Sequence, residues 1–160
     1  MYSAKIMSLD KLSRILATER QNSRQVVFTN GCFDILHPGH VGYLAAAREL
    51  GDLLVVGLNS DASIRRLKGE RRPIMPEASR AQLLAALAAV DFVTIFSEDD
   101  PYALIKILRP EILVKGGDWE PSAIVGADLV RENGGRVLSL PFMETYSTTA
   151  IIQEILRRYC

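Results

Sequence analysis

Short and nearly continuous apolar runs recur along the chain, separated by longer segments in which apolar residues have helical spacing. Five such runs predict strands over residues 25–29, 53–58, 92–96, 112–115 and 136–140. Polar and apolar positions do not alternate within these runs, which is typical of strands buried on both faces in a parallel sheet. The pattern therefore predicts five parallel strands covered by helices.

The segments between the strands place apolar residues three and four positions apart, as on one face of a helix. They predict helices over residues 9–19, 41–50, 77–89, 101–108 and 147–158. Helix-ending signals agree, because Gly51 follows one segment and the Asn-Gly-Gly at 133–135 ends a further one. This alternation predicts an α/β fold: a single Rossmann-like, doubly wound, parallel five-stranded sheet with helices on both faces.

The chain shows no internal repeat, linker or low-complexity segment, and its 160 residues suit one domain. We therefore expect a single domain over residues 1–160. Its core is predicted over residues 25–160, and residues 1–24 are predicted to form an N-terminal helical appendage packed on that core.

Composition excludes several classes of partner. Nineteen Lys and Arg residues balance nineteen Asp and Glu residues, and a neutral chain has no long-range attraction for nucleic acid or an anionic membrane. No apolar run approaches the roughly 20 residues of a membrane span, and the N-terminus lacks the apolar core of a signal peptide. Cys32 and Cys160 do not suggest a disulfide framework. We expect a cytoplasmic protein without nucleic-acid or membrane partners.

Open α/β sheets bind ligands outside the carboxyl ends of their strands, so candidate chemistry is expected in the loops that follow the predicted strands. The first loop, residues 29–40, reads Thr-Asn-Gly-Cys-Phe-Asp-Ile-Leu-His-Pro-Gly-His. His37 and His40 lie where the next helix begins, and free N–H groups at a helix start favour an anion. We therefore interpret the loop as a phosphate site. One alternative is a zinc site that also uses Cys32 and Asp34, although the chain has no second cluster of ligands to complete it. The other alternative is a structural turn capped by histidine.

A second candidate is the basic segment over residues 65–73, which holds five Lys or Arg residues in eight positions. It is either a solvated mobile loop or a lid that brings Lys68 onto triphosphate oxygens and Arg72 onto a sugar phosphate. Arg80, at the start of the next helix, is expected to face the same cleft.

Two further loops carry candidate chemistry. Residues 115–119 read Lys-Gly-Gly-Asp-Trp, which is either an ordinary turn or a segment whose glycine backbone lies against a base or ribose. Residues 147–149 read Ser-Thr-Thr at the start of the last helix. These hydroxyls can cap the helix, and a helix N-terminus with hydroxyls can also hold phosphate.

The run Gly-Cys-Phe-Asp at 31–34 followed by His-Pro-Gly-His at 37–40 resembles the signature of the HxGH nucleotidyltransferase superfamily. Together with the motifs at 66–69, 96–99, 113–118 and 147–149, nearly the whole chain resembles the adenylyltransferase half of the bifunctional ADP-heptose synthases, in a stand-alone form. That resemblance implies transfer of AMP from ATP to D-glycero-β-D-manno-heptose 1-phosphate, with release of pyrophosphate.

Motifs and resemblance together give a set of expected site residues. Those expected to act in catalysis are His37, His40 and Lys68. Those expected to bind the nucleotide are Thr29, Asn30, Gly31, Cys32, Phe33, His37, His40, Lys115, Gly116, Gly117, Asp118, Ser147, Thr148 and Thr149. Those expected to bind the sugar phosphate are Asp34, Arg72 and Arg80.

The predicted mechanism is in-line attack of a sugar 1-phosphate oxygen on the α-phosphorus of ATP. A phosphate monoester is largely ionised at pH 7, so no catalytic base is required. Mg²⁺ is expected to accompany ATP, without a metal site made of protein ligands alone. A homodimer is an open expectation, because nucleotidyltransferases of this fold are often dimers.

Rival functions remain open at this stage. Glycerol-3-phosphate cytidylyltransferases carry Arg-Thr-Glu-Gly-Ile before Ser-Thr-Thr, whereas residues 142–146 read Phe-Met-Glu-Thr-Tyr, which favours ATP over CTP. FAD synthetases of the archaeal type share the histidine motif. A non-catalytic nucleotide sensor would not need the histidines and Lys68, and a dinucleotide-binding dehydrogenase would need the absent Gly-x-Gly-x-x-Gly.

Overall fold

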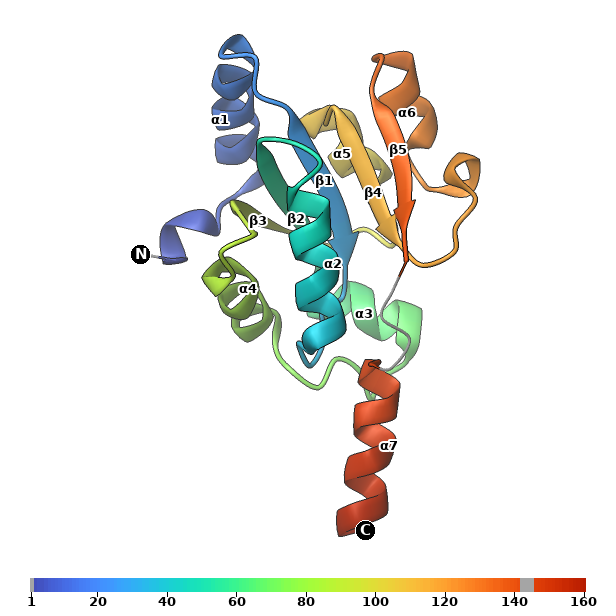
Figure 1. Cartoon of the computed structure of the whole chain (residues 1–160). Coiled ribbons are helices and arrows are strands. Elements are labelled where there is room, and N and C mark those ends of the chain that lie inside the picture. The colour runs from blue at the N-terminus through green and yellow to red at the C-terminus, as the bar shows by residue number, and fades with distance from the viewer. Residues whose placement is uncertain (1, 142–145) are drawn as a thin grey trace.

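The computed structural model covers the chain and describes residues 2–141 and 146–160. Its centre is a five-stranded sheet in the order β3-β2-β1-β4-β5, in which every neighbouring pair is parallel. The strands are β1 (Val26–Gly31), β2 (Leu53–Asn59), β3 (Phe92–Phe96), β4 (Ile112–Gly116) and β5 (Arg136–Leu140). This order reverses beside β1, so the predicted doubly wound α/β fold is confirmed (Figure 1).

Helices connect the strands and cover the sheet. The α-helices are α1 (Leu9–Gln21), α2 (Pro38–Arg48), α3 (Asp61–Lys68), α4 (Glu77–Ala86), α5 (Tyr102–Leu108), α6 (Ala127–Glu132) and α7 (Thr148–Tyr159). Two short 3-10 helices, η1 (Tyr2–Lys5) and η2 (Pro121–Ala123), complete the described elements. Among the described residues, no helix is long and apolar enough to cross a membrane.

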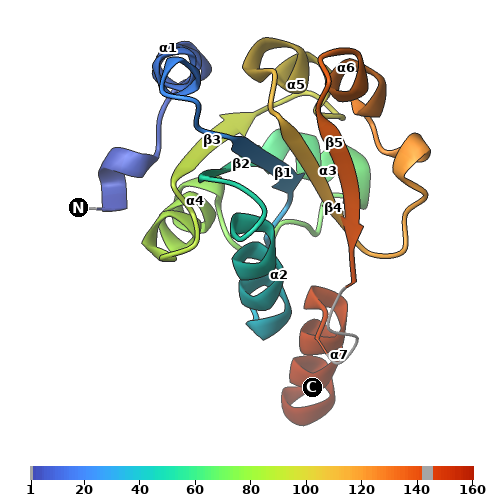
Figure 2. The same ribbon diagram turned by 45° about the horizontal axis from the view of Figure 1, so that its top comes forward.

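The sheet separates two apolar layers. In one layer α1, α5 and α6 pack on residues such as Phe28 and Leu113, and in the other α2 and α4 pack on residues such as Val56 and Val114. Figure 2 shows these two groups of helices on opposite sides of the strands. Leu12 and Leu16 of α1 are fully buried, so the N-terminal helix contributes to the same core as β1.

The five predicted helices differ from the structure by one to three residues at one or both ends, and the difference is largest in α2 and α4. Helix α2 begins at Pro38 rather than at residue 41, because proline suits the first helical position, where no backbone N–H is needed. Helix α4 ends at Ala86 rather than at residue 89, because Leu87 takes an extended backbone conformation.

The interpretation of residues 65–73 as a loop or lid is wrong for its first half. Residues 65–68 are the last turn of α3, which begins after Ser60 and ends at Lys68, with Gly69 as its C-cap. The Ser60 hydroxyl caps the helix by accepting a hydrogen bond from Ser63 N. Lys68 is therefore held at a helix end, next to the sheet edge, rather than on a free loop.

Candidate functional site

A cavity of about 480 Å³ lies at the carboxyl ends of the strands, at the sheet edge where α3 and the start of α7 are found (Figure 1). This is the place that the sheet topology favours for a ligand. Its described lining residues are Asn30, Gly31, Cys32, Phe33, Asp34, His40, Tyr43, Asn59, Leu67, Lys68, Arg72, Asp99, Asp100, Pro101, Lys115, Gly116, Trp119, Ala123, Ile124, Val125 and Thr148.

The loop between β1 and α2 forms the floor of this cavity and is unusually tight. Phe33 and Ile35 have φ angles of 44° and 53°, in the left-handed region that side chains other than glycine rarely adopt. Gly31 permits this path, because a Cβ there would meet Cε2 of the Phe33 ring at 3.0 Å. Strained backbone at a ligand-binding edge persists only when its surroundings fix it.

Asp34 fixes the loop from within. Its buried carboxylate accepts hydrogen bonds from Arg72 Nε at 2.7 Å, from Ile74 N at 2.9 Å and from Met75 N at 3.0 Å. Burial acts to raise the pKa of Asp34, but these hydrogen bonds outweigh it and the pKa is lowered. Thr148 Oγ1 also donates to Asp34 O at 2.6 Å. Asp34 therefore joins the β1–α2 loop to the segment after α3 and to the start of α7.

Arg80 does not line the cavity, contrary to the sequence prediction. It is buried, with 1% of its surface exposed, and its guanidinium forms an ion pair with Asp61 Oδ1 at 2.7 Å. The same group donates to the backbone oxygens of Cys32, Asn59 and Met75. Because these partners satisfy the guanidinium, Arg80 holds three loops together beneath the site, and we assign it no substrate contact.

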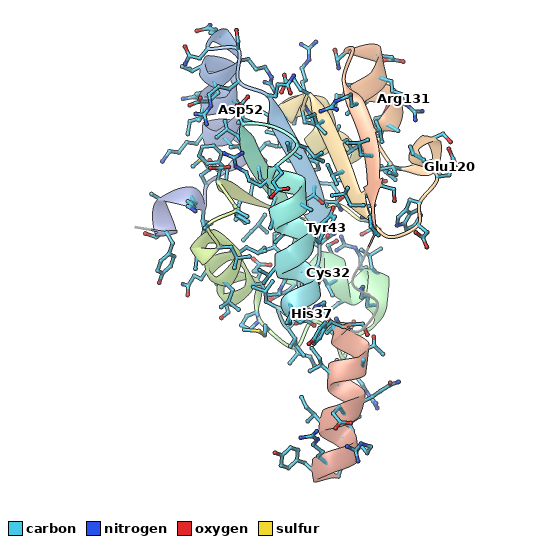
Figure 3. The ribbon with its side chains drawn as sticks, in the orientation of Figure 1. Cys32, His37, Tyr43, Asp52, Glu120 and Arg131 are labelled. Atoms are coloured by element: carbon cyan, nitrogen blue, oxygen red, sulfur yellow. The ribbon has the colours of Figure 1, made fainter. Side chains whose placement is uncertain are left out.

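The two histidines stand at the first turn of α2, where Figure 3 labels His37. Their rings stack with centroids 3.7 Å apart and an angle of 25° between the planes. The Nδ1 atoms of both rings are buried and have no hydrogen-bond partner in the described part of the chain. Such orphaned buried atoms point to a ligand that would satisfy them.

Both imidazoles are neutral at pH 7 in the unliganded protein. Burial lowers the pKa of His40 to about 4, and the charges of His37 and Lys68 act in the same direction. Burial also lowers the pKa of His37. A phosphate group placed beside them would favour the protonated forms, because an opposite charge stabilises the imidazolium.

Gly39, the third residue of the histidine motif, makes this stacking possible. A Cβ at position 39 would lie 3.1 Å from both Cε1 and Nδ1 of His37. That distance is tighter than ordinary contact, so a larger residue would push the His37 ring away from its place over the helix start.

Cationic side chains approach the cavity from β4, from the end of α3 and from the segment after α3. Lys68, Arg72 and Lys115 line it together. Burial lowers the pKa of Lys115; the neighbouring Cys32 acts to raise it, and the charge of Lys68 lowers it further. Two lysines that repel each other across a cavity favour a polyanion between them.

Several predicted residues lie outside the cavity. Thr29 is buried and shares a hydrogen bond of 2.7 Å with the Tyr43 hydroxyl, whereas Gly117, Asp118 and Thr149 are not among the lining residues. His37 stacks on His40, and is also not among them. The predictions for Phe142 to Thr145, including the comparison with the cytidylyltransferase motif, lie outside the described residues.

The serine and the first threonine at the start of α7 have different contacts. The Ser147 hydroxyl caps the helix by accepting from Ala150 N at 3.0 Å, and Thr148 lines the cavity. The capping interpretation is therefore confirmed for Ser147, and phosphate binding by this motif stays a prediction.

Sequence reasoning missed one wall of the cavity. That wall is apolar and contains Pro101, Trp119 and residues 123–125 around η2. It carried no polar motif, so only the rule that the loops after the strands meet at one edge could have indicated it. The same rule could also have indicated Asn59, at the end of β2, and Asp99, just after β3.

The zinc interpretation of the histidine loop has no support in the geometry. Within residues 2–141 and 146–160, no group of three or more His, Cys, Asp or Glu side chains could hold a metal ion. The carboxylate of Asp34 is already bound to Arg72 and to two backbone N–H groups.

The sheet carries at one edge a helix start, a pair of stacked histidines of which His40 lines the cavity, and several cations on the cavity wall. This arrangement is typical of an α/β nucleotidyltransferase of the HxGH type. Residues 28–154 match the cytidylyltransferase-like family. The chain therefore belongs to this family of nucleotidyltransferases.

Comparison with curated proteins shows which members of the family the chain resembles. The chain is 58% identical to the bifunctional protein HldE of Trichlorobacter lovleyi and 56% identical to that of Geobacter metallireducens. Each match covers 98% of this chain and 32% of the relative. The chain thus spans about one third of the length of these relatives.

Solved structures agree with the fold. The lipopolysaccharide core biosynthesis protein of Thermoplasma volcanium is 33% identical, with a TM-score of 0.59, and the match covers 74% of this chain and 96% of that one. Pantothenate synthetase of Thermus thermophilus is 19% identical, with a TM-score of 0.54 and coverage of 86% and 61%. The second likeness shows the fold alone.

Proposed function

We propose that this nucleotidyltransferase transfers AMP from ATP to a sugar 1-phosphate, D-glycero-β-D-manno-heptose 1-phosphate, and releases pyrophosphate. The observation that carries the proposal is the pair of buried, unpartnered Nδ1 atoms beside a cavity that lysines approach. The likeness to the HldE proteins and to a lipopolysaccharide core biosynthesis protein supports the choice of sugar.

The cavity suits a nucleotide because its two sides differ in polarity. Lys68, Arg72 and Lys115 would neutralise phosphate oxygens, and the apolar wall near Trp119 would accept a base. The N–H groups at the start of α2 add positive potential on the side where the histidines stand.

The reaction needs little proton chemistry from the protein. The attacking oxygen belongs to a phosphate that is already ionised at pH 7, so positioning and charge neutralisation carry most of the rate. His40 would donate a hydrogen bond to a phosphate oxygen as negative charge moves onto the leaving pyrophosphate. His37, packed against His40, would hold its ring or make a second contact.

Mg²⁺ is proposed to bind with ATP. Asp99 and Asp100 are the exposed carboxylates that line the cavity. Such a small donor set fits a metal that takes most of its ligands from phosphates and water. When bound, the ion would neutralise phosphate charge. ATP is a cytoplasmic substrate, so we also propose a cytoplasmic location.

The test is a pyrophosphate-release assay in which ATP and CTP are each combined with a panel of sugar phosphates and with glycerol 3-phosphate. We expect ATP with the heptose 1-phosphate to give the highest kcat/KM. Equal or faster turnover with CTP, or a preference for glycerol 3-phosphate, would contradict the proposed substrates.

A further inference from the structure

The turn that follows β4 brings the single tryptophan of the chain to the cavity. Lys115 and Gly116, the last residues of β4, line the cavity, and so does Trp119 three residues further on. Trp119 is 50% exposed, and the chain has no other tryptophan. Because this indole is not fixed by burial in the core, it offers a constant surface to a ligand only if its backbone is held in place.

Strand β5 holds this turn through one serine hydroxyl. Ser139 Oγ donates a hydrogen bond to Gly117 O and accepts one from Trp119 N at 3.2 Å. Gly117 N also donates to Leu140 O at 2.8 Å. In the described part of the chain, these are the hydrogen bonds that tie residues 117–119 to the rest of the fold. Ser139 therefore fixes both ends of the turn; Figure 3 labels Glu120, the next residue along this loop.

The place of Ser139 in the sheet lets it reach the turn without reaching a ligand. Strand β5 is an edge strand, and in its parallel register Ser139 lies opposite Lys115 and Leu140 lies opposite Gly116. Ser139 is not among the described residues that line the cavity. Any effect of its hydroxyl on a bound molecule must therefore pass through the turn.

The groups that face the phosphates stand on other elements. His40 belongs to α2 and Lys68 to the end of α3. A loosened turn would thus change the surface offered to a base while leaving these groups in place. A ligand that meets an ordered side chain loses less of its binding free energy to ordering than one that must fix a mobile side chain.

We propose that Ser139 is a positioning residue for the nucleotide, because its hydroxyl fixes the turn at 117–119 so that the Trp119 indole packs on the base. The inference rests on the proposed function, since it takes ATP to be the molecule in the cavity. It assigns to Ser139 an effect on nucleotide affinity and none on the chemical step.

The experiment measures KM for ATP and kcat by pyrophosphate release. Ser139→Ala should raise KM about three- to tenfold, the usual effect of losing a hydrogen bond, and should leave kcat nearly unchanged. Ser139→Thr keeps the hydroxyl and should keep the wild-type KM. Ser122→Ala is the matched control with the same expected result, because the Ser122 hydroxyl reaches Glu120 Oε1 only at 3.5 Å.

Two further measurements separate positioning from a merely structural role. Inorganic tripolyphosphate has no base, so its inhibition constant against ATP should be the same for Ser139→Ala and the wild type. The fluorescence anisotropy of Trp119 in the unliganded protein should be lower in Ser139→Ala and restored in Ser139→Thr. If Ser139→Ala does not fold, Ser139→Val takes its place, because valine and threonine have the same shape and both suit a strand.

The outcomes distinguish this inference from the proposed function. Wild-type KM and anisotropy in a folded variant without the hydroxyl, or an equal loss of affinity for tripolyphosphate, would overturn the role of Ser139 while ATP turnover by the wild type stands. A folded Ser139→Thr variant that behaves like Ser139→Ala would overturn it as well. A wild type that neither binds nor converts ATP would instead remove the proposed function, and this inference with it.

Discussion

The rings of His37 and His40 stack 3.7 Å apart at the start of α2, and Nδ1 of each is buried without a partner in the described chain. Such a pair is costly in the unliganded protein, because buried polar atoms without hydrogen bonds lose their contacts with water. A phosphate group that accepts from both rings would remove that cost. The relationship makes the histidines the centre of the proposed site.

The first prediction concerns catalysis by this pair. His40→Ala and His37→Ala should each lower kcat by about 10² to 10³, the usual loss when one preorganised donor is removed. The double variant should lose less than the product of the two single losses, because both groups act on one charge. Steady-state pyrophosphate release measures these changes, and unchanged kcat in a folded single variant would remove that histidine from the mechanism.

The second prediction concerns pH and stability. The pKa of His40 is about 4 in the folded chain and near 6.5 in the unfolded chain, so the unfolded chain binds more protons between these values. The free energy of unfolding should therefore fall as the pH is lowered from 6.5 to 4. Because the pKa of His37 is lowered too, it adds a fall in the same direction.

The variant His40→Asn isolates the first contribution. Urea unfolding at several pH values should show a smaller fall between pH 6.5 and 4 in this variant than in the wild type. Identical profiles would mean that His40 does not titrate as its burial predicts. With bound nucleotide the wild-type dependence should weaken, since phosphate favours the protonated imidazole.

The third prediction separates the structural role of Arg80 from substrate binding. Arg80→Met should destabilise the fold by about 3 to 5 kcal/mol, because it leaves the partners of a buried ion pair without their cation. Chemical denaturation measures this change. A variant of normal stability whose KM for the sugar phosphate is raised would restore the sequence-based assignment of Arg80 to the substrate.

The fourth prediction compares two residues of the last turn of α3. Lys68 lines the cavity and Arg65 does not, although both are exposed basic residues of the same segment. Because Lys68 would neutralise triphosphate charge, Lys68→Ala should lower kcat/KM for ATP about tenfold or more, or roughly 1.4 kcal/mol, and Arg65→Ala should leave it nearly unchanged. Equal effects would mean that the segment acts only through its general charge.

Much of the fold followed from the sequence because the sheet is buried on both faces. The runs at 92–96 and 136–140 were predicted with the bounds that the structure has, since short apolar runs between helical segments leave few alternatives. Helix α3 was missed because its eight residues include three basic side chains in the last turn, a composition that also suits a loop.

The site could be predicted only where neighbouring residues in the sequence form a motif. The histidine loop and the Lys-Gly-Gly turn carry their chemistry in consecutive residues, so their positions could be inferred. The role of Arg80 depends on Asp61 and on three backbone oxygens that meet only in the folded chain. The direction of α7 likewise has no signal in its own residues, because the apolar residues of a helix suit packing on any apolar surface.

The identity of the phosphorus products tests the central claim most directly. Phosphorus-31 NMR of the wild type with ATP, Mg²⁺ and D-glycero-β-D-manno-heptose 1-phosphate should show pyrophosphate and a nucleoside diphosphate sugar growing in equal amounts. Both signals should be lost in His40→Ala at the same protein concentration. Formation of ADP with a sugar bisphosphate, which marks transfer of the γ-phosphate, or the absence of any product from folded wild type would contradict adenylyl transfer at the histidine pair.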